Sequence, residues 1–341
     1  MHFRIMKKML KHLKSLFEPE ETHFPRPVSS GFPLTASPLF LFNQPMASWS
    51  PSLAQSPHTL TSTPLEALRI LTWNVDFASP NPPLRMHTLL ANLESFLGEE
   101  TPPIVILLQE VHPDALKLLL GYEWVRRNFA VTNIALARNS LTYGTVTLVT
   151  KDLFPSVGRC FRVPFKESAY GRDAVFLDLK IVNPQVDGSM TQGGKIRDKV
   201  LRIGNTHLES LSGHGTVTRP LQLATIKDVL SLPEVYAGIV GGDMNAIAVE
   251  DEDLPAWVGL KDLWEGDGGE TWGYQPPCSF PPRRLDKILA MGDVRIVQGT
   301  QMELIGVGLK TGPDEGCGIA GEGYVSDHYG LLSTIQVRMK T

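Results

Sequence analysis

Residues Ala237 to Asn245, which read AGIVGGDMN, place a carboxylate and an amide directly after a short apolar run. Apolar runs of this length with glycine beside them are typical of a buried strand, so Asp243 and Asn245 are expected at its carboxyl end. The glycines would let backbone approach a ligand closely. The pattern fits a site for chemistry, and it equally fits a turn in which Asp243 binds nearby backbone N–H groups.

Other polar side chains lie at or near the ends of further predicted strands. They are Asn74, Glu110, His207, and the pair Asp327 and His328. Because buried strands line up in sheets, their ends can converge on one rim. A single His after a strand is more often a hydrogen-bonded structural residue, and Glu110 could instead be a carboxylate that the dipole favours at a helix start. Five such positions in register favour a common site.

The residue types in this set suit the hydrolysis of a phosphate ester. A hard divalent cation prefers carboxylate and amide oxygens as ligands. A water nucleophile needs a carboxylate oriented by an amide, and a phosphoryl transition state needs imidazole or amide donors where its charge develops. The set contains each of these types.

The elements that must position these residues alternate between strand and helix patterns, as in an α/β fold. Besides the run before Asp243, strand patterns cover residues 68–73, 104–108, 143–150, 174–182, 200–205, 286–290 and the end of 324–337. Helix patterns cover residues 85–97, 113–120, 218–230 and 257–264. A polar, glycine-rich stretch around residues 187–198 is expected to be a surface excursion.

The composition narrows the class of protein. The chain has 341 residues, of which 42% are hydrophobic and 20% charged, as in an ordinary soluble globular protein. Its formal net charge of -4 excludes a globally basic nucleic-acid binder, so a phosphate-binding surface must be local. Cys160, Cys278 and Cys317 form no CxxC pair, which argues against disulfides and zinc and favours a reducing, intracellular compartment. No apolar stretch approaches the roughly 20 residues of a transmembrane helix.

The first 64 residues differ in character from the rest. Residues 1–17 carry Arg and Lys but no acid, and their apolar residues fall at helical spacing, which predicts a basic amphipathic helix. Such a helix could be a mitochondrial transit peptide, a peripheral membrane anchor, a nucleic-acid contact or only a solvated terminus. Residues 18–64 are rich in Pro, Ser and Thr, which predicts a disordered linker. The catalytic domain is therefore expected to span residues 65–341.

Six short motifs in this order resemble the endonuclease/exonuclease/phosphatase superfamily. They are TWN at 72–74, LQEV at 108–111, NTHLES at 205–210, GGDMN at 241–245, RRLDKIL at 283–289 and SDH at 326–328. The resemblance covers about residues 68–337. Within the superfamily, HLES followed by GH at 213–214, TW at 271–272 and SDHYGLL at 326–332 are most similar to the 5′-tyrosyl-DNA phosphodiesterases.

The resemblance implies a fold and a cofactor. The fold would be α/β, a four-layered α/β sandwich in which two packed mixed β-sheets are flanked by helices. The cofactor would be one catalytic Mg2+, with Mn2+ as an alternative. Glu110 would be the principal metal ligand, helped by Asn74 and, through water, by Asp327.

The resemblance also implies roles for the other residues. Asp243 would orient or deprotonate the attacking water, and Asn74 belongs to the same catalytic group. The residues that would hold the phosphate and stabilise its transition state are Asn245, His207 and His328. Trp272 would pack beside the substrate. Tyr143 resembles the aromatic residue near the substrate end in that family, with an ordinary surface tyrosine as the alternative.

Three features depart from the tyrosyl-DNA enzymes. Ile247 stands where they place an arginine thought to contact phosphate, and Gly273 follows Trp272 where they usually place Asp. Contacts with the substrate can therefore differ. The small ubiquitin-binding domain often found ahead of the catalytic domain is not recognisable in residues 1–64, so its partners are not expected here.

The implied function is Mg-dependent hydrolysis of the link between a tyrosine side chain and a DNA 5′ phosphate, which repairs trapped topoisomerase adducts. The expected partner is DNA with a 5′-tyrosyl adduct at a single-stranded end. The expected location is the nucleus, with the mitochondrion as the alternative that residues 1–17 raise. Other superfamily activities stay open, namely abasic-site endonuclease, deadenylase, inositol phosphatase and sphingomyelinase, as does a non-catalytic binding protein on the same fold.

Overall fold

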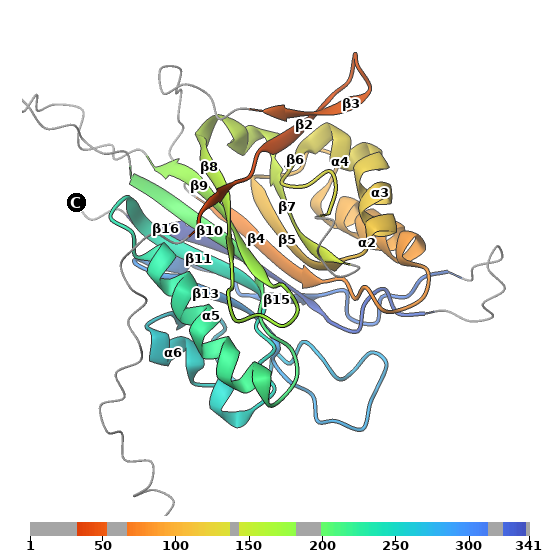
Figure 1. Cartoon of the computed structure of the whole chain (residues 1–341). Helices are drawn as coiled ribbons and strands as arrows, with labels where there is room; N and C mark the ends of the chain where they lie inside the picture. Colours follow the sequence, from red (N-terminus) through yellow and green to blue (C-terminus); the bar gives the residue numbers. More distant parts are fainter. Residues whose placement is uncertain (1–32, 53–66, 137–142, 182–198, 313–322, 339–341) are drawn as a thin grey trace, which may run out of the picture. The chain divides into compact units, whose positions relative to one another are not determined.

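Two mixed β-sheets pack face to face in this computed structural model, which describes residues 33–52, 67–136, 143–181, 199–312 and 323–338 (Figure 1). The seven-stranded sheet has the order β1 (Thr35–Ala36), β8 (Val157–Pro164), β9 (Asp173–Ile181), β10 (Lys199–His207), β11 (Val235–Asp243), β13 (Asp286–Met291), β12 (Lys261–Asp262). The nine-stranded sheet has the order β14 (Val294–Ile296), β16 (Gly330–Val337), β4 (Leu68–Asn74), β5 (Ile104–Val111), β7 (Gly144–Thr150), β6 (Phe129–Val131), β2 (Leu39–Asn43), β3 (Ser48–Ser52), and β15 (Glu303–Ile305) pairs with β16.

Helices cover the outer faces of both sheets (Figure 1). The nine-stranded sheet is covered by α2 (Pro82–Leu97), α3 (Pro113–Gly121) and α4 (Glu123–Asn128), and the seven-stranded sheet by α5 (His214–Leu230) and α6 (Leu254–Val258). Two short 3-10 helices, η1 (Lys151–Ser156) and η2 (Val249–Asp251), lie between strands. The four-layered α/β sandwich expected from the sequence is confirmed. No helix among the described residues is long and apolar enough to cross a membrane.

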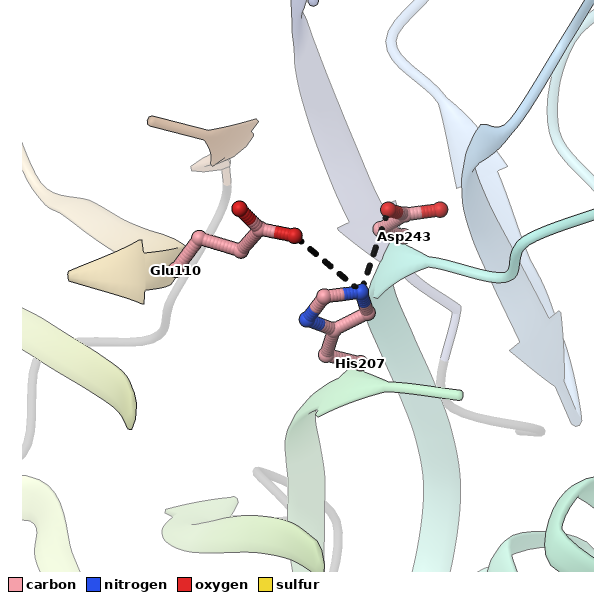
Figure 2. A group of neighbouring side chains, drawn as sticks. All are labelled: Glu110, His207 and Asp243. Carbon is pink, nitrogen blue, oxygen red and sulfur yellow. Dashed lines mark ion pairs between the residues drawn. The ribbon is translucent and has the colours of Figure 1, made fainter. Parts of the chain in front are cut away.

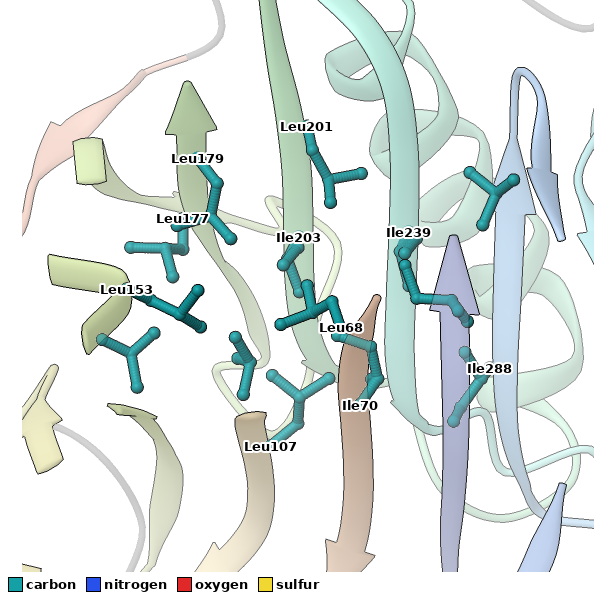
Figure 3. Packing of buried hydrophobic residues seen from close by; sticks show 14 of the residues in the cluster. Leu68, Ile70, Leu107, Leu153, Leu177, Leu179, Leu201, Ile203, Ile239 and Ile288 are labelled. Atoms are coloured by element: carbon teal, nitrogen blue, oxygen red, sulfur yellow. The ribbon is translucent and has the colours of Figure 1, made fainter. Parts of the chain in front are cut away.

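Alternation along the strands builds two separate cores. Successive side chains of a strand point to opposite faces, so Ile70 of β4 packs between the sheets while Leu71 and Trp73 pack beneath the helices. Figure 3 shows the core between the sheets, where Leu107 of β5 faces Ile203 of β10 and their neighbours. Residues buried at helical spacing on α2 close the second core. The two cores fix both sheets against each other and against α2.

Two parallel strand pairs determine where the polar side chains meet. β4 and β5 are parallel neighbours in one sheet, and β10 and β11 are parallel neighbours in the other. The carboxyl ends of parallel strands lie at the same edge of a sheet, so Asn74 and Glu110 emerge together, as do His207 and Asp243. The glycines before Asp243 serve the strands rather than a ligand, because a Cβ on Gly242 would lie 1.9 Å from the carbonyl oxygen of Thr206 on β10.

The predicted disordered linker over residues 18–64 is wrong for residues 35–52, which form β1, β2 and β3. Leu39 and Phe42 are only 3% and 8% exposed, and β2 pairs with both β3 and β6. Trp49 donates its Nε1–H to the carbonyl of Leu120 over 3.0 Å. The short LFLF run alternates between the two cores, a pattern that the surrounding Pro and Ser conceal. The domain therefore includes residue 35 rather than beginning at 65; residues 1–32, with the predicted basic helix, and 53–64 lie outside the described residues.

Smaller differences concern helix ends and unpredicted strands. The helix predicted over residues 257–264 is wrong, because α6 ends at Val258 and the chain turns at Gly259, whose φ of 85° suits glycine, into β12. The strands β6 and β8 are not predicted from the sequence, because β6 is short and β8 carries polar residues. The predicted surface excursion at residues 187–198 lies outside the described residues.

A truncation series tests the corrected boundary. Removing residues 1–32 is expected to leave the melting temperature unchanged, whereas removing residues 1–52 should lower the free energy of unfolding by roughly 3–6 kcal/mol, because Leu39 and Phe42 each contribute about 1.5–3 kcal/mol on burial. Thermal unfolding of both variants and the full chain is the measurement. Equal melting temperatures for all three would show that β2 and β3 add nothing to the fold.

Candidate active site

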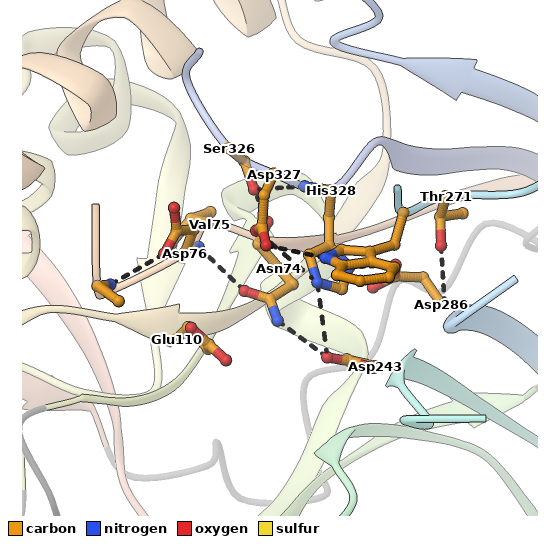
Figure 4. A network of polar contacts seen from close by, with 12 residues as sticks. Asn74, Val75, Asp76, Glu110, Asp243, Thr271, Asp286, Ser326, Asp327 and His328 are labelled. Carbon is orange, nitrogen blue, oxygen red and sulfur yellow. Dashed lines mark hydrogen bonds and ion pairs between the residues drawn. The ribbon is translucent and has the colours of Figure 1, made fainter. Parts of the chain in front are cut away.

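The carboxyl ends of β4, β5, β10 and β11 deliver polar side chains to one place (Figure 2 and Figure 4). Asn74 donates from Nδ2 to Asp243 Oδ2 over 2.9 Å. His207 Nε2 lies 3.3 Å from the same carboxylate oxygen and 3.7 Å from Oε1 of Glu110 (Figure 2). Asp243 and His207 are each 2% exposed, so both groups are shielded from bulk solvent.

The loop before β16 adds the remaining members. His328 directs Nε2 toward Asp243 Oδ2 at 4.0 Å and toward Asp327 Oδ1 at 3.8 Å. Its Nδ1 lies 2.7 Å from Oδ2 of Asp286, a buried carboxylate at the start of β13. The sequence analysis gave Asp286 no role, although RRLDKIL, with an acid entering an apolar strand, carried a signal for it. Asp286 holds the imidazole so that Nε2 faces the cluster.

Backbone contacts anchor this loop to β4. Ser326 Oγ donates to the carbonyl of Asn74 over 2.6 Å and accepts from the backbone N–H of His328. Trp73 donates its Nε1–H to the carbonyl of His328 over 3.0 Å. Arg85 of α2 donates to the carbonyls of Val75 and Val325, and burial lowers its pKa against the opposing effect of Asp76. These contacts fix the backbone of the loop and therefore the positions from which the side chains of Asp327 and His328 project.

The charges of the cluster shift the pKa values of Asp243 and His328 in the direction opposite to the effect of burial. Burial alone would raise the pKa of Asp243, but His207, His328 and the N–H of Asn245 hold that pKa below its usual value. Burial alone would lower the pKa of His328, but Asp286 and Asp327 together with Asp243 raise it well above the usual value. Burial raises the pKa of Asp327, and the nearby His328 reduces this rise. The arrangement therefore favours an ionised Asp243 beside a protonated His328.

Glu110 occupies an unusual backbone conformation for a residue other than glycine, with φ at 56°. The register of β5 against β7 shifts between Leu108 and Val111, and this bulge turns the Glu110 side chain into the cluster. Its Oε2 accepts the backbone N–H of Phe77 over 3.1 Å, and its Oε1 lies 3.7 Å from Nε2 of His207. The side chain of Glu110 is 17% exposed, so its carboxylate can reach a cation that enters the cluster.

His207 is held from behind by Arg172, which precedes β9 and which the sequence analysis did not identify. Arg172 Nη1 contacts Nδ1 of His207, and Nη2 donates to Ser210 Oγ over 2.8 Å. Because a guanidinium donates only, Nδ1 must accept, which leaves the ring proton on Nε2. Nε2 is buried without a hydrogen-bond partner, so it points an N–H into the space between Glu110 and Asp243.

These contacts decide which groups could hold a metal. Glu110, His207 and Asp243 offer ligand atoms within 4.8 Å of one another. A protonated Nε2 cannot coordinate a cation, and a hard cation prefers oxygen, so the oxygens of Glu110 fit that role and His207 fits a donor to phosphate. Asn74 Oδ1 accepts the N–H of Asp76 and keeps a second lone pair. Asp327 Oδ2 accepts from Trp272, so its contact with a metal through water stays a prediction.

Asn245 lies at the rim in a turn fixed by its own neighbours. Its φ is 47°, its N–H donates to Asp243 Oδ1 over 2.8 Å, and its Nδ2 donates to the carbonyl of Leu208 over 3.0 Å. The turn interpretation of the GGDMN stretch is thus correct for the backbone, and it coexists with the cluster. Only part of the Asn245 amide remains for a phosphate.

Aromatic side chains border the cluster at two ends. The ring of Tyr143 stacks on Phe77 with centroids 3.9 Å apart and lies 6.3 Å from the ring of His207. At the other end, Trp272 donates its Nε1–H to Asp327 Oδ2 over 2.9 Å. Beside Tyr143 lies a hollow of about 330 Å³. Its lining includes Tyr143, Tyr170, Arg172 and His207. The cluster thus lies between an aromatic hollow and a tryptophan.

A buried polar group joins the sheets beneath the cluster. Gln109 donates from Nε2 to Thr72 Oγ1 over 3.0 Å and to Asn205 Oδ1 over 2.8 Å. Asn205 in turn donates to the carbonyls of Leu108 and Val146. These residues of β4, β5 and β10 hold the ends of the strands in register across the two sheets, so the QE and NTH motifs also have a structural role.

Two of the three departures noted in the sequence, at residues 247 and 273, have different surroundings. Ile247 is partly buried and donates its N–H to the carbonyl of Asn245 over 2.8 Å. Gly273 has a φ of 100°, and a Cβ there would lie 2.9 Å from Cα of Pro282. The backbone therefore requires glycine at 273, whereas Ile247 replaces a charge with an apolar side chain.

Comparison with known proteins identifies the class to which this geometry belongs. The model of the Endonuclease/Exonuclease/phosphatase family matches residues 71–328, and the chain belongs to this family. Members of the family are generally phosphoric diester hydrolases and commonly use divalent metals, which agrees with the oxygen and imidazole groups assembled here. A comparison with curated proteins finds no significant sequence match.

Among solved structures the chain is similar to TDP2 from two animals and to a bacterial protein. TDP2 of D. rerio, complexed with a single strand DNA product, is 20% identical with a TM-score of 0.56, over 80% of this chain and 99% of that one. TDP2 from C. elegans is 21% identical with a TM-score of 0.56, over 80% and 75%. The endonuclease/exonuclease/phosphatase from Bacteroides vulgatus is 17% identical with a TM-score of 0.54, over 80% and 99%. Likeness at these identities establishes the shared fold.

Proposed function

We propose that this protein is a magnesium-dependent phosphodiesterase that hydrolyses the bond between a tyrosine side chain and a DNA 5′ phosphate. The observation that carries the proposal is the Asp243, His207 and His328 cluster bordered by Tyr143 and Trp272. The cluster supplies groups for phosphoryl transfer, and the aromatic rings supply surfaces for a base or a phenol. The motifs shared with 5′-tyrosyl-DNA phosphodiesterases and the DNA complex of the D. rerio protein support the same substrate.

Asp243 suits the task of holding the attacking water. Its Oδ1 accepts from Asn245 and its Oδ2 from Asn74, so the carboxylate has a fixed orientation. A carboxylate with a lowered pKa is a weak base, and it therefore orients the water and receives its proton only as the new bond to phosphorus forms. The water oxygen attacks phosphorus, the bond from phosphorus to the tyrosyl oxygen breaks, and the products are a DNA 5′ phosphate and free tyrosine.

The two histidines act as hydrogen-bond donors, in contrast to the carboxylate of Asp243. His207, with its proton on Nε2, and His328, protonated between Asp286 and the cluster, both direct N–H groups at the space beside Asp243. Donors fixed before the reaction stabilise charge that develops on phosphate oxygens without a cost of reorganisation. His328 also provides a proton source within reach of a departing phenolate.

A divalent cation would supply positive charge that the side chains of the cluster do not. A divalent cation at Glu110, Mg2+ or Mn2+, would polarise the phosphate and neutralise the developing charge. The residues present fit that group, because Glu110 Oε1 and the second lone pair of Asn74 Oδ1 are hard oxygen donors. Asp327 would contribute through water.

The decisive experiment compares three matched oligonucleotides with tyrosine on the 5′ phosphate, tyrosine on the 3′ phosphate, and an internal abasic analogue. The 5′-tyrosyl strand should be cleaved fastest, and only with a divalent metal. Faster cleavage of either other strand would overturn the substrate assignment. No turnover of any phosphodiester at any metal concentration would instead indicate a binding protein on this fold.

Substitutions at the aromatic rings test the bordering surfaces. Tyr143→Leu and Trp272→Leu should each raise KM for the 5′-tyrosyl strand roughly tenfold, because one stacked ring contributes about 1–3 kcal/mol. Trp257→Leu on α6 is the matched control, since Trp257 is 49% exposed and has no place in the cluster. An unchanged KM in both site variants would remove the rings from the substrate contacts.

The proposed location is the nucleus, where DNA adducts arise, with the mitochondrion as the alternative. Residues 1–17 have the composition of a transit or membrane-surface helix. Imaging the full chain beside a variant that lacks residues 1–32 tests this. An unchanged distribution would mean that the segment does not direct location.

A further inference from the structure

Glu209, in the HLES motif, is a fully buried carboxylate that the proposed chemistry does not use. Its Oε1 accepts the N–H of Ala169 over 2.9 Å, and its Oε2 accepts from Ser168 Oγ over 2.6 Å. Oε2 also accepts from Gln222 Nε2 of α5 over 3.1 Å, and Gln222 Oε1 accepts the N–H of Glu209. The carboxylate therefore bonds two residues of the loop between β8 and β9 and one residue of α5.

The same loop carries Arg172 to His207. Ser168 Oγ, which donates to Glu209, accepts the backbone N–H of Arg172 over 2.8 Å. His214, the histidine of the GH motif, contacts the carbonyl of Glu167 through Nε2 over 2.8 Å. A continuous set of contacts thus runs from α5 through Glu209 and Ser168 to Arg172.

Arg172 has two consequences for the site. Its guanidinium fixes the ring proton of His207 on Nε2, which faces Glu110 and Asp243. It also lies 5.1 Å from the ring centroid of Tyr143 and 5.5 Å from that of Tyr170, and all three line the hollow beside His207. Displacing the loop would therefore change both the donor at His207 and the wall of the hollow.

We propose that Glu209 is a positioning residue, which holds the loop of residues 165–172 on α5 so that Arg172 orients His207 and closes the wall of the aromatic hollow. This role rests on the proposed phosphodiesterase function. It gives the HLES and GH motifs a purpose that is distinct from phosphate binding, because neither Glu209 nor His214 needs to touch the substrate.

The experiment combines Glu209→Gln with Arg172→Ala in a double-mutant cycle. Glutamine keeps the shape of the side chain, but its NH2 group replaces either Oε1 or Oε2. It therefore faces either the backbone N–H of Ala169 or the donors of Ser168 and Gln222, and at least one contact of the loop is lost. Glu209→Gln alone should lower kcat/KM on bis(4-nitrophenyl) phosphate and on the 5′-tyrosyl strand by on the order of tenfold to a hundredfold, the scale of a small misplacement of catalytic groups. In the Arg172→Ala background the same change should add less than about twofold, because the two act in series.

Hydrogen exchange of residues 165–172 supplies a readout that needs neither substrate nor metal. Glu209→Gln should accelerate exchange in this segment, and Ser168→Ala, at a half-buried position, should do the same with about a fivefold loss of kcat/KM, the scale of one hydrogen bond. Asp178→Asn, which alters a buried carboxylate paired with Arg202 toward the other end of β9, should change neither loop exchange nor kcat/KM.

The outcomes separate the two proposals. Multiplicative losses in the double variant, or unchanged exchange of residues 165–172 in Glu209→Gln, would overturn the positioning role. Absence of activity in the wild-type protein on both substrates would overturn the proposed function, while the exchange measurement would still decide whether Glu209 holds the loop.

Discussion

Asp243→Asn should lower kcat by at least about a thousandfold while the protein remains folded. The change removes the negative charge that both His207 and His328 face, and it removes the acceptor for the proton of the attacking water. Loss of a positioned general base alone costs about 10²–10⁴-fold. The asparagine NH2 group must also face a donor, either the backbone N–H of Asn245 or the Nδ2 of Asn74 and the Nε2 of His207, so the water loses its fixed orientation as well.

The measurement is kcat on the 5′-tyrosyl strand at saturating substrate and magnesium, with the melting temperature recorded for each variant. Unfavourable donor contacts in the site should cost about 1–3 kcal/mol of stability. Asp178→Asn is the matched control, because it makes the same change at a buried carboxylate whose partners are Arg202 and Arg159. A folded Asp243→Asn enzyme with wild-type kcat would remove Asp243 from the chemistry.

The sequence predicted the architecture well because the site depends on strand ends. Each apolar run that ends in a polar residue can be recognised in the sequence separately. Once β4 pairs in parallel with β5, and β10 with β11, Asn74 must lie near Glu110 and His207 near Asp243. The resemblance carried by the six motifs then implied two packed sheets. Residues at the strand ends, such as Asn74, Glu110 and Asp243, could therefore be named in advance.

Residues that act through long-range contacts could not be predicted in the same way. Arg172 lies at the end of a loop, and nothing in the sequence GRDAV indicates that its guanidinium contacts His207. Asp286 and Glu209 stand inside recognised motifs, but their partners lie 42 and 41 residues away, at His328 and Ser168. The strand β2 could not be predicted for the same reason. It lies in a segment rich in Pro and Ser, and Leu39 and Phe42 become buried only when β2 pairs with β6.

Glu110→Gln should weaken metal binding while the stability of the fold changes little. Phe77 keeps an acceptor in the glutamine carbonyl, and the backbone at φ 56° suits Gln no worse than Glu, so the change isolates the lost charge. Removing even an outer contact of a metal ligand costs about 10–100-fold in affinity. Loss of a charged oxygen that contacts a hard cation should therefore cost at least about a hundredfold.

Magnesium titrations of activity and of bound metal measure the loss of Glu110 directly. Turnover should be absent at magnesium concentrations that saturate the wild-type enzyme and partly restored by a large excess, because an amide oxygen is a weaker ligand but still a ligand. Calorimetry without substrate should give the same displacement of the magnesium curve. Glu94→Gln on α2, which alters a carboxylate bonded to Tyr122, should leave both curves unchanged. Wild-type activity of Glu110→Gln at every metal concentration would place the cation elsewhere, whereas a loss that no excess of magnesium relieves would mean that the carboxylate acts on the substrate rather than on the metal.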